Sequence, residues 1–172
     1  MRWIEEIGPD SDIVISSRMR LARNLREYPF PIALTKEKSK QVIQTIFHAV
    51  EGLEQQKSLG GKLELYVLEE ISSLERQVLL EKHLISPNLL QNYEKGAVLL
   101  NQDESISIMI NEEDHIRIQC LLSGSQLDAA FQIADHIDDV LEEKLEYAFD
   151  EQFGYLSSCP TNVGTGIRAS VM

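Results

Sequence analysis

Three short apolar segments follow one another between residues 97 and 122, and they constrain the fold more than any other part of the sequence. They cover residues 97–101, 105–110 and 115–122, and polar residues separate each from the next. Segments of this length and composition are typical of strands, and strands joined by such short connections pair antiparallel. The sequence therefore predicts a β-meander at the centre of the fold.

The flanking sequence adds two strands and three amphipathic helices. Thr35, Ser72 and Ser125 each precede an apolar stripe with helical spacing and are predicted N-caps, and Ser72 begins a capping box. The predicted helices cover residues 35–55, 72–84 and 125–149, the predicted strands cover 12–21 and 63–68, and residues from 154 onward are predicted loop. Because there is no regular βαβ rhythm, we expect an α+β fold, with an antiparallel β-sheet flanked by helices in one domain over residues 1–172.

Charge and hydropathy exclude several classes of function. The net charge of −12 argues against direct binding to nucleic acid, which requires a basic face. No apolar run approaches the roughly 20 residues of a membrane span, and the N-terminus lacks a secretion signal, so we expect a cytoplasmic protein with no membrane partner. Cys120 and Cys159 show no CxxC spacing, which favours reduced thiols over a zinc site or a disulfide.

Four of the eight arginines lie within residues 18–26, although the protein is acidic overall. In the predicted strand, Arg18 and Arg20 share one side, while Met19 and Leu21 share the other. Two guanidinium groups on one face repel each other unless water or an anion reaches them, and a polyphosphate suits the pair because each arginine can hold two oxygens. A charged, exposed edge strand is an equally good interpretation of this segment alone.

The segment NEEDHIR, residues 111–117, joins three consecutive carboxylates to a predicted strand. Alternation places His115, Arg117 and Gln119 on one face of that strand, so acidic and basic groups come close together. Phosphoryl transfer to a guanidine needs such a pairing, because carboxylates orient the acceptor and withdraw a proton while arginines hold the triphosphate. By itself, an acidic turn is more often only a solvated turn.

The segment CPTNVGTGIR, residues 159–168, contains glycine, hydroxyl and amide groups that can surround an anion. It does not match the GxxxxGK[ST] phosphate loop, and no clear βαβ unit surrounds it, which argues against a dinucleotide-binding fold. Cys159 can act as a thiolate beside a cationic substrate. The GxG pattern alone is a weak indication of function.

Taken together, the segments SSRMRLAR, NEEDHIR and CPTNVGTGIRAS resemble three signature blocks of the phosphagen kinases, the ATP:guanidino phosphotransferases, in that family's order. The similarity runs from about Asp12 to Met172, although the helices between the blocks contribute little to it. The resemblance implies a phosphagen-kinase-type catalytic domain that transfers phosphate from ATP, with Mg²⁺, to a guanidino nitrogen.

The resemblance also implies which residues bind the nucleotide. Arg18 and Arg20 correspond to phosphate ligands, in agreement with their shared side of the strand. His83 corresponds to a nucleotide-contacting histidine, although the residue by itself would be interpreted as a surface histidine. The implied nucleotide-binding residues are Ser16, Ser17, Arg18, Met19, Arg20, His83, Arg117, Arg168, Ala169, Ser170, Val171 and Met172.

For the chemistry, the resemblance assigns Glu113 as the carboxylate that orients the acceptor guanidinium and serves as catalytic base. Glu112 and Asp114 would support the site, with a hydrated magnesium near Asp114 and no side chain bound directly to the metal. Cys159 matches a cysteine that lies against the guanidinium. The implied catalytic residues are Glu112, Glu113 and Cys159.

Two departures from the family pattern bear on the acceptor. Kinases of small guanidines carry a helical domain of roughly a hundred residues before the first arginine block, which begins here at Ser16, and this chain stops at Met172, before the family's last strands. We therefore expect a catalytic domain that lacks a separate N-terminal helical domain and is truncated at its C-terminus. An open acceptor site fits an arginine side chain on a protein, as in the bacterial branch of the family, which the segments DIVISSRMRLARNLREYPFP and EKHLISP also resemble.

Two alternatives stay open on the sequence alone. The chain could phosphorylate free arginine or another small guanidine, or it could be a truncated, non-catalytic module that binds nucleotide or a partner. The bacterial resemblance further implies a connection to stress response and protein quality control, with protein substrates, an activator protein and stress-protease machinery as candidate partners. It leaves oligomerisation open.

Overall fold

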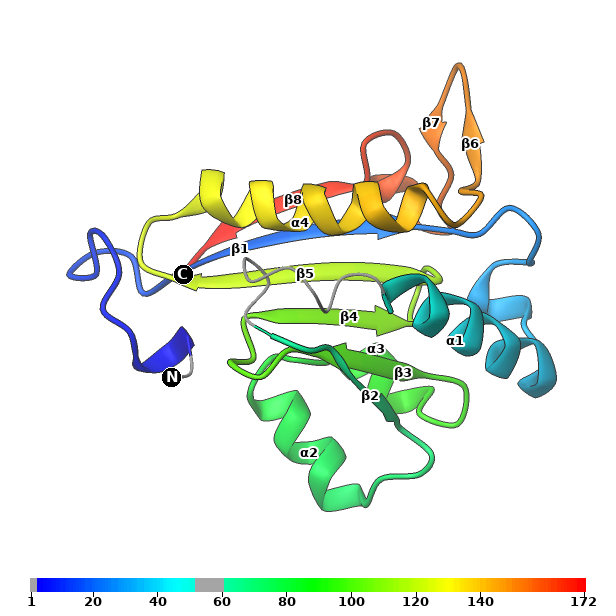
Figure 1. Cartoon of the computed structure of the whole chain (residues 1–172), viewed down its shortest axis with the longest axis horizontal. Helices are drawn as coiled ribbons and strands as arrows, with labels where there is room; N and C mark the ends of the chain where they lie inside the picture. Colours follow the sequence, from blue (N-terminus) through cyan, green and yellow to red (C-terminus); the bar gives the residue numbers. More distant parts are fainter. Residues whose placement is uncertain (1–2, 52–60) are drawn as a thin grey trace.

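The structure, a computed structural model, describes residues 3–51 and 61–172. Within these residues, six strands form one antiparallel sheet in the order β2-β3-β4-β5-β1-β8, and a separate two-stranded hairpin, β6-β7, projects beyond it (Figure 1). The strands are β1 (Ser16–Arg23), β2 (Glu64–Val67), β3 (Ala97–Leu100), β4 (Ile106–Ile110), β5 (Ile116–Ser123), β6 (Phe149–Asp150), β7 (Gly154–Tyr155) and β8 (Ile167–Val171). The expected α+β class, with an antiparallel sheet flanked by helices, is confirmed.

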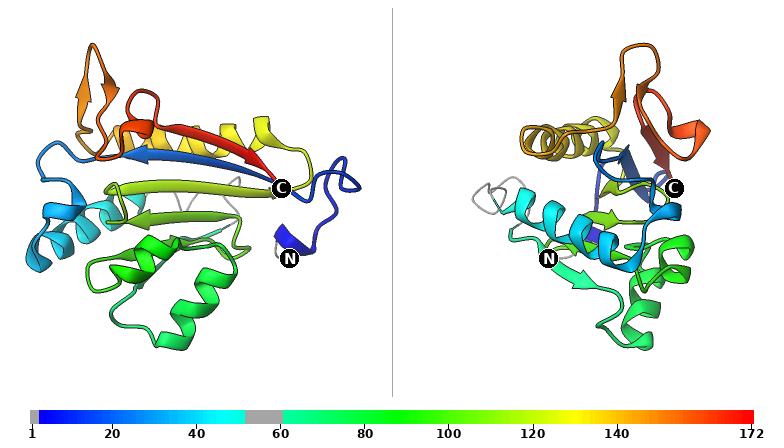
Figure 2. Two further views of the ribbon diagram at one scale, coloured as in Figure 1. Left: turned by 180° about the vertical axis from the view of Figure 1, so that it is seen from behind. Right: turned by 90° about the vertical axis from the view of Figure 1, so that its right-hand side faces the viewer.

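Helices lie on both faces of the sheet, and each face has its own apolar cluster. The two longer helices, α1 and α4, pack on one face, whereas α2 and α3 lie on the other, over β3 and β4 (Figure 2). The α-helices are α1 (Lys36–Val50), α2 (Ser73–Glu81), α3 (Pro87–Gln91) and α4 (Leu127–Glu142), and the 3₁₀ turns are η1 (Trp3–Glu5), η2 (Pro31–Ala33) and η5 (Pro160–Asn162). Among the described residues, none of these helices is long and apolar enough to cross a membrane.

The larger cluster lies between the sheet and the pair α1 and α4. The strands contribute inward-facing residues such as Leu21 of β1, Ile108 of β4 and Ile118 of β5. Ile46 of α1 and Ile137 of α4 belong to the same cluster, and all five residues are at most 1% exposed. Complete burial of such a side chain contributes roughly 1.5–3 kcal/mol. The second cluster fills the space under α2 and α3, so these helices cover the opposite face over β3 and β4.

The predicted meander is confirmed, since β3, β4 and β5 pair in sequence order. The first strand begins later than predicted, at Ser16 instead of residue 12. Ile13 and Ile15 are 81% and 72% exposed, so the apolar alternation that suggested a longer strand does not reflect burial. Helix α1 has the predicted N-cap at Thr35, and the predicted continuation of this helix to residue 55 falls in part outside the described residues.

The capping box predicted at Ser72 is confirmed, with Glu75 as its second member. Helix α2 ends at Glu81, earlier than predicted, and His83 just beyond it has a positive φ of 59°. A left-handed residue cannot continue a right-handed helix. Ser86 does not simply end a helix, because its hydroxyl accepts a hydrogen bond from Leu89 N and caps the short helix α3.

Two predicted limits of α4 are wrong. Gln126, not Ser125, is the N-cap residue, and Gln126 N donates to Ser17 Oγ at 2.8 Å, so a distant hydroxyl replaces the local one. The helix ends at Glu142 instead of residue 149. Beyond it the chain turns back, and Tyr147 forms a bridge with Leu25 that a continued helix would prevent.

The interpretation of residues 154 onward as loop is also wrong, because β8 pairs antiparallel with β1. Gly166 explains how the chain enters this strand. Its O accepts a hydrogen bond from Ala22 N at 3.0 Å, and its φ is +65°. A Cβ at this position would lie 2.6 Å from Ala22 O, so only glycine allows the close approach.

Candidate active site

Strands β5, β1 and β8 place arginines on the face of the sheet that α1 and α4 do not cover. Arg20 lies opposite Gln119 of β5 and Arg168 of β8, and directly opposed residues of antiparallel strands point to the same side. Arg18 follows the same alternation, and its Nε donates to Ser170 Oγ of β8 at 3.2 Å. The predicted shared side of Arg18 and Arg20 is confirmed, and the register adds Arg168 to them.

Burial and the charges of neighbouring arginines lower the pKa values of Arg18 and Arg20. The pKa of Arg20 falls to about 10, first because of burial and then because of repulsion from Arg117, Arg18 and Arg168, against a smaller opposing effect of Glu112. Arg20 therefore stays cationic at neutral pH. Its Nε has no hydrogen-bond partner within the part of the chain that the structure describes. A bound anion would relieve the repulsion.

The acidic turn between β4 and β5 delivers two carboxylates with different surroundings. Glu112 is 7% exposed, accepts hydrogen bonds from Ser86 Oγ at 2.7 Å and from Arg117 Nη1 at 2.9 Å, and so fixes the Arg117 guanidinium. Burial acts to raise the pKa of Glu112, but the charge of Arg117 and these hydrogen bonds prevail and lower it. Glu113 is exposed, and its side chain lines the cleft beside the arginines.

Asp114 acts as an anchor for the loop that carries Cys159. Its carboxylate is 2% exposed and accepts hydrogen bonds from the side chains of Asn24, Ser157 and Asn162, at 2.6, 2.7 and 3.1 Å. These contacts join the end of β1, the acidic turn and the start of η5. The hydrated magnesium expected near Asp114 stays a prediction, and this carboxylate is already saturated by donors from its own chain.

A cleft on this face brings together residues from all three predicted segments. We call it the arginine cleft; its volume is about 80 Å³. Cys159 reaches it from the loop before η5, with Sγ 3.0 Å from Thr161 Oγ1. The cleft is lined by Arg20, Leu21, Ala22, Glu113, Arg117, Cys159, Thr161, Asn162, Gly166 and Arg168. Residues separated by up to about 150 positions in the sequence therefore face one small space.

His83 approaches the same face from α2. Its backbone O accepts a hydrogen bond from Gln119 Nε2 at 2.8 Å, and Gln119 is the direct neighbour of Arg20 across the strands. The backbone of His83 thus lies one residue from Arg20 across the sheet, and its side chain is exposed. His115, by contrast, precedes β5 and is fully buried, and Leu25 N donates to its Nδ1 at 3.0 Å.

Several predicted nucleotide-binding residues do not line the cleft. Ser17 and Met19 lie on the α4 side of β1, are at most 5% exposed, and the Ser17 hydroxyl donates to Gly124 O at 2.8 Å. Ser16 is 1% exposed, whereas the end of β8 is mostly exposed beside β1. The residues that stay outside the lining of the cleft are Ser16, Ser17, Arg18, Met19, His83, Ala169, Ser170, Val171 and Met172. Their contacts with a nucleotide stay predictions.

Sequence reasoning missed the role of Arg23. It is 4% exposed, and its Nε and Nη2 donate to Asp138 Oδ2 of α4 at 3.0 and 2.6 Å. Its Nη1 donates to Thr165 O at 2.8 Å, and the guanidinium lies 3.6 Å from the centroid of the Tyr155 ring. Arg23 therefore holds the segment just before β8 in place. The one available signal was an aspartate inside the apolar stripe of α4.

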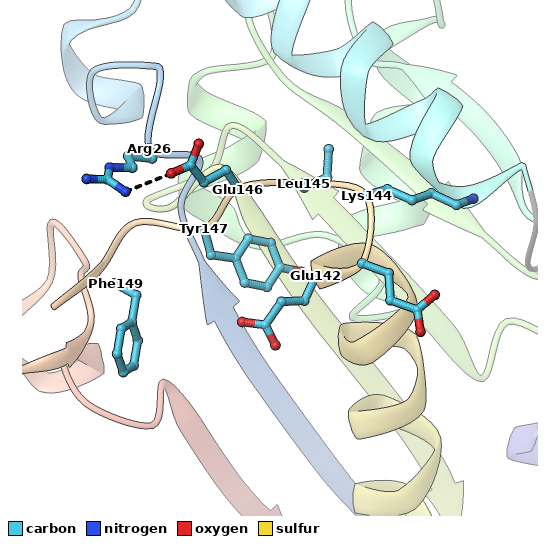
Figure 3. Close-up of a pocket in the computed structure, with 8 residues that line it drawn as sticks. Arg26, Glu142, Lys144, Leu145, Glu146, Tyr147 and Phe149 are labelled. Carbon is cyan, nitrogen blue, oxygen red and sulfur yellow. Dashed lines mark hydrogen bonds and ion pairs between the residues drawn. The ribbon is translucent and has the colours of Figure 1, made fainter. Parts of the chain in front are cut away.

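A wider pocket lies at the end of α4, with a volume of about 550 Å³ (Figure 3). We call it the acidic pocket; it is lined by Arg26, Glu142, Glu143, Lys144, Leu145, Glu146, Tyr147 and Phe149. Arg26 Nη1 lies 2.7 Å from Glu146 Oε1, and Glu142 accepts a hydrogen bond from Tyr155 Oη at 2.9 Å. It contains none of the residues that the sequence assigned to the site.

Comparison with protein families identifies the domain. The model of the ATP:guanido phosphotransferase C-terminal catalytic domain matches residues 41–172. Curated relatives include the protein-arginine kinases of Pelotomaculum thermopropionicum and Brevibacillus brevis, which are 56% and 54% identical over 170 residues. Each alignment covers 99% of this chain and 48% or 47% of the relative, so the chain spans about half the length of the curated relatives that it matches.

Solved structures agree with this assignment. The substrate-free duplicated taurocyamine kinase from Schistosoma mansoni superposes with a TM-score of 0.82 at 27% identity, over 97% of this chain and 25% of that chain. A lombricine kinase superposes with a TM-score of 0.78 at 27% identity, over 94% of this chain and 48% of that chain. The taurocyamine kinase with bound transition-state analogue components has a TM-score of 0.85 over 100% of this chain and 25% of that chain, but at 24% identity it supports the fold alone.

Proposed function

This chain belongs to the ATP:guanido phosphotransferase family, and on that basis we propose that it forms the part of a kinase that phosphorylates arginine side chains of proteins. The observation that carries the proposal is the arginine cleft, which unites Arg20, Arg117 and Arg168 with Glu113 and Cys159. Cations for a triphosphate and a carboxylate for a guanidinium thus face the same space. This is the pairing that phosphoryl transfer to a guanidine requires.

In the proposed reaction, the arginine face holds the phosphates of ATP and Glu113 holds the acceptor guanidinium. A guanidino nitrogen attacks the γ-phosphorus, the N–P bond forms, and the bond from phosphorus to the leaving oxygen of ADP breaks. The proton lost by the nitrogen passes to the Glu113 carboxylate. Glu112 contributes by fixing Arg117, and Cys159 is proposed to lie against the guanidinium, the role that the family resemblance implies for it.

The small volume of the arginine cleft fits this division of the site. Pockets that enclose whole small molecules have volumes of about 300–1,000 Å³, whereas the cleft has about 80 Å³. The cleft has room for the reacting groups, while Arg18, Ser170 and His83 extend the polar surface along β1 and β8 for the rest of the nucleotide. ATP is proposed to bind as its magnesium complex, in which the metal neutralises phosphate charge and is held through the nucleotide and water.

The protein acceptor is favoured over a free guanidine by curated relatives above 50% identity, such as those of Pelotomaculum thermopropionicum and Brevibacillus brevis, which are named protein-arginine kinases. A second candidate, phosphorylation of a small guanidine, is supported by the structural likeness to taurocyamine and lombricine kinases at 27% identity. The cytoplasmic location, the connection to stress response and protein quality control, and an activator protein or protease partner stay predictions from the sequence.

Direct detection of phosphoarginine tests the proposal. The protein expressed from its complete natural reading frame is incubated with Mg-ATP and an arginine-containing acceptor protein, and products are analysed at neutral pH by mass spectrometry. We expect acid-labile phosphate on arginine side chains. Phosphorylation of free arginine but not of the protein would favour the small-guanidine kinase, and phosphate on neither acceptor would contradict both kinase functions.

A further inference from the structure

A groove beside the arginine cleft shares the predicted catalytic carboxylate with it. This groove, which we call the acceptor groove, has a volume of about 480 Å³ and is lined by Glu113 together with Ile32, Asn88, Asn92, Asn111 and Ser158, among others. Neither Arg20 nor Arg168 lines it, so it leads from Glu113 away from the arginines. An acceptor whose guanidinium reaches Glu113 has space there for the atoms that follow the guanidinium.

Among the polar groups that line the acceptor groove, side-chain amides outnumber unpaired charged groups. Asn88 and Asn92 are exposed, and Asn92 Nδ2 donates to the O and Oδ1 atoms of Asn88 at 3.1 and 3.2 Å. Lys95, which also lines the groove, donates from Nζ to Leu34 O at 2.7 Å, so its charge is held by the backbone. Side-chain amides both donate and accept hydrogen bonds, as a peptide backbone does.

Asn111 adds a buried acceptor at this surface. It is 2% exposed and has a φ of 58°, and its Nδ2 donates to Ser39 O at 3.1 Å and to Lys95 O at 3.0 Å. Its Oδ1 has no hydrogen-bond partner among residues 3–51 and 61–172. Because this Oδ1 is itself buried, Asn111 supports the groove through the two hydrogen bonds that its Nδ2 donates.

Ile32 gives the groove an apolar rim. Its side chain is 91% exposed, although the adjacent Pro31 is buried. A single exposed isoleucine needs no explanation in general, but this one lines the groove that leads to Glu113. There it can pack against a side chain next to the target arginine.

We propose that the acceptor groove binds the extended peptide segment that flanks the target arginine of a protein substrate. Asn88 and Asn92 hydrogen-bond the peptide backbone, and Ile32 packs against a neighbouring side chain. Backbone hydrogen bonds of this kind give affinity without a strict sequence requirement. The inference rests on the proposed function, because it assumes that the acceptor is an arginine within a polypeptide.

Binding of a peptide tests the groove separately from catalysis. The probe is a fluorescent nonapeptide with a central arginine flanked by alanine and glycine, titrated by anisotropy with the protein from its complete reading frame. We expect the double variant Ile32→Ser/Asn88→Ala to bind the nonapeptide about 10-fold more weakly than the wild type. Its affinity for ADP should stay within about twofold, because neither side chain lines the arginine cleft.

The matched control is Ile7→Ser/Gln77→Ala, which changes an equally exposed isoleucine and an exposed amide outside the groove. This control should keep the wild-type affinity for the nonapeptide. A competitor that carries only one residue, Nα-acetyl-arginine N-methylamide, should bind the wild type and the groove variant equally.

The outcomes separate the two proposals. Equal affinity of the groove variant and the wild type for the nonapeptide, or no binding of the nonapeptide by the wild type, would overturn the groove. If the wild type binds the nonapeptide through the groove but forms no phosphoarginine from it, the proposed kinase function fails while the peptide-binding groove stands.

Discussion

The arginine cleft and the acidic pocket differ in size and in how their charges are satisfied. The acidic pocket is wider, at about 550 Å³ against about 80 Å³, but its Arg26 and Glu146 neutralise each other at the surface. In the arginine cleft, Arg20 is half-buried among other arginines, and its Nε has no hydrogen-bond partner among the described residues. Unsatisfied like charges, which the fold tolerates at a cost, are therefore a better indication of the proposed site than volume is.

Substitution of a carboxylate should produce the largest difference in phosphoryl transfer between the two regions. We expect Glu113→Gln to reduce phosphoryl transfer by a factor of about 10²–10⁴, because the amide keeps the shape but cannot accept the proton. Affinity for ADP should stay within about twofold. Quantification of phosphoarginine and calorimetric titration with ADP measure the two quantities.

The matched control for Glu113→Gln is Glu143→Gln, which changes an exposed glutamate of the acidic pocket. It should leave phosphoryl transfer unchanged. If both substitutions reduced transfer equally, or if Glu113→Gln weakened ADP binding as much as transfer, Glu113 would not be the base.

The second prediction concerns His115, which joins the two regions. Leu25 N donates to His115 Nδ1 at 3.0 Å, and Leu25 forms the bridge with Tyr147 at the acidic pocket. Burial lowers the pKa of His115 to about 4, so the folded protein disfavours protonation. Above about pH 6.5, the pKa of histidine in the unfolded chain, this group does not reduce the free energy of unfolding. As the pH falls from 6.5 towards 4, the unfolded chain binds a proton that the folded protein does not, and the free energy of unfolding falls by about 3 kcal/mol in total.

Urea unfolding at pH 7.5 and pH 5.0 measures this loss for the wild type and for His115→Gln, which keeps one donor and one acceptor. The free energy of unfolding of the wild type should fall more steeply over this range than that of the variant. Parallel pH profiles would show that His115 does not titrate between the folded and unfolded states as its burial requires.

The third prediction exploits the repulsion within the arginine face. Arg20→Gln removes a half-buried cation beside Arg117, Arg18 and Arg168, so the protein without nucleotide should be slightly stabilised. The same change should weaken ATP and ADP binding about 10- to 100-fold, because a charge-assisted contact contributes roughly 1.5–3 kcal/mol. If the cleft binds phosphate, thermal unfolding should show a higher stability of the variant and calorimetric titration a lower nucleotide affinity. Unchanged nucleotide affinity would refute that role.

The smallest effect is expected in the acidic pocket. Arg26→Gln breaks an ion pair whose side chains are 69% and 61% exposed, so the free energy of unfolding should change by less than about 1 kcal/mol. Nucleotide affinity should not change. A loss of ADP binding comparable to that of Arg20→Gln would mean that the acidic pocket takes part in the site.

The sequence predicts the chemical groups of the site more completely than it predicts the strands that position them. Alternation within β1 correctly placed Arg18 and Arg20 together, since the period of two is a local property of any strand. No local signal showed that Arg168 lies beside them, because β8 is short, exposed and preceded by glycines, and so it was taken for loop. Its pairing with β1 depends on residues about 150 positions away.

Local hydrogen bonds were predictable for the same reason. The capping box at Ser72 and the N-cap at Thr35 involve partners three residues away, and both formed as expected. The N-terminus of α4 was not predictable, because the helix begins one residue later than Ser125 and Gln126 N donates to the hydroxyl of the distant Ser17 in β1.

The sequence by itself determined the alternating sides of β1, the meander, the first turns of α1 and α2, and the three segments that supply arginines, carboxylates and Cys159. Tertiary structure alone decided that Asp114 anchors the Cys159 loop, that Arg23 pairs with Asp138 of α4, and that Glu113 stands between the arginine cleft and the acceptor groove. The physical reason is the range of the interactions. Periodicity and capping act over two to four residues, whereas these contacts join groups that are brought together only when the sheet closes and α4 packs on it.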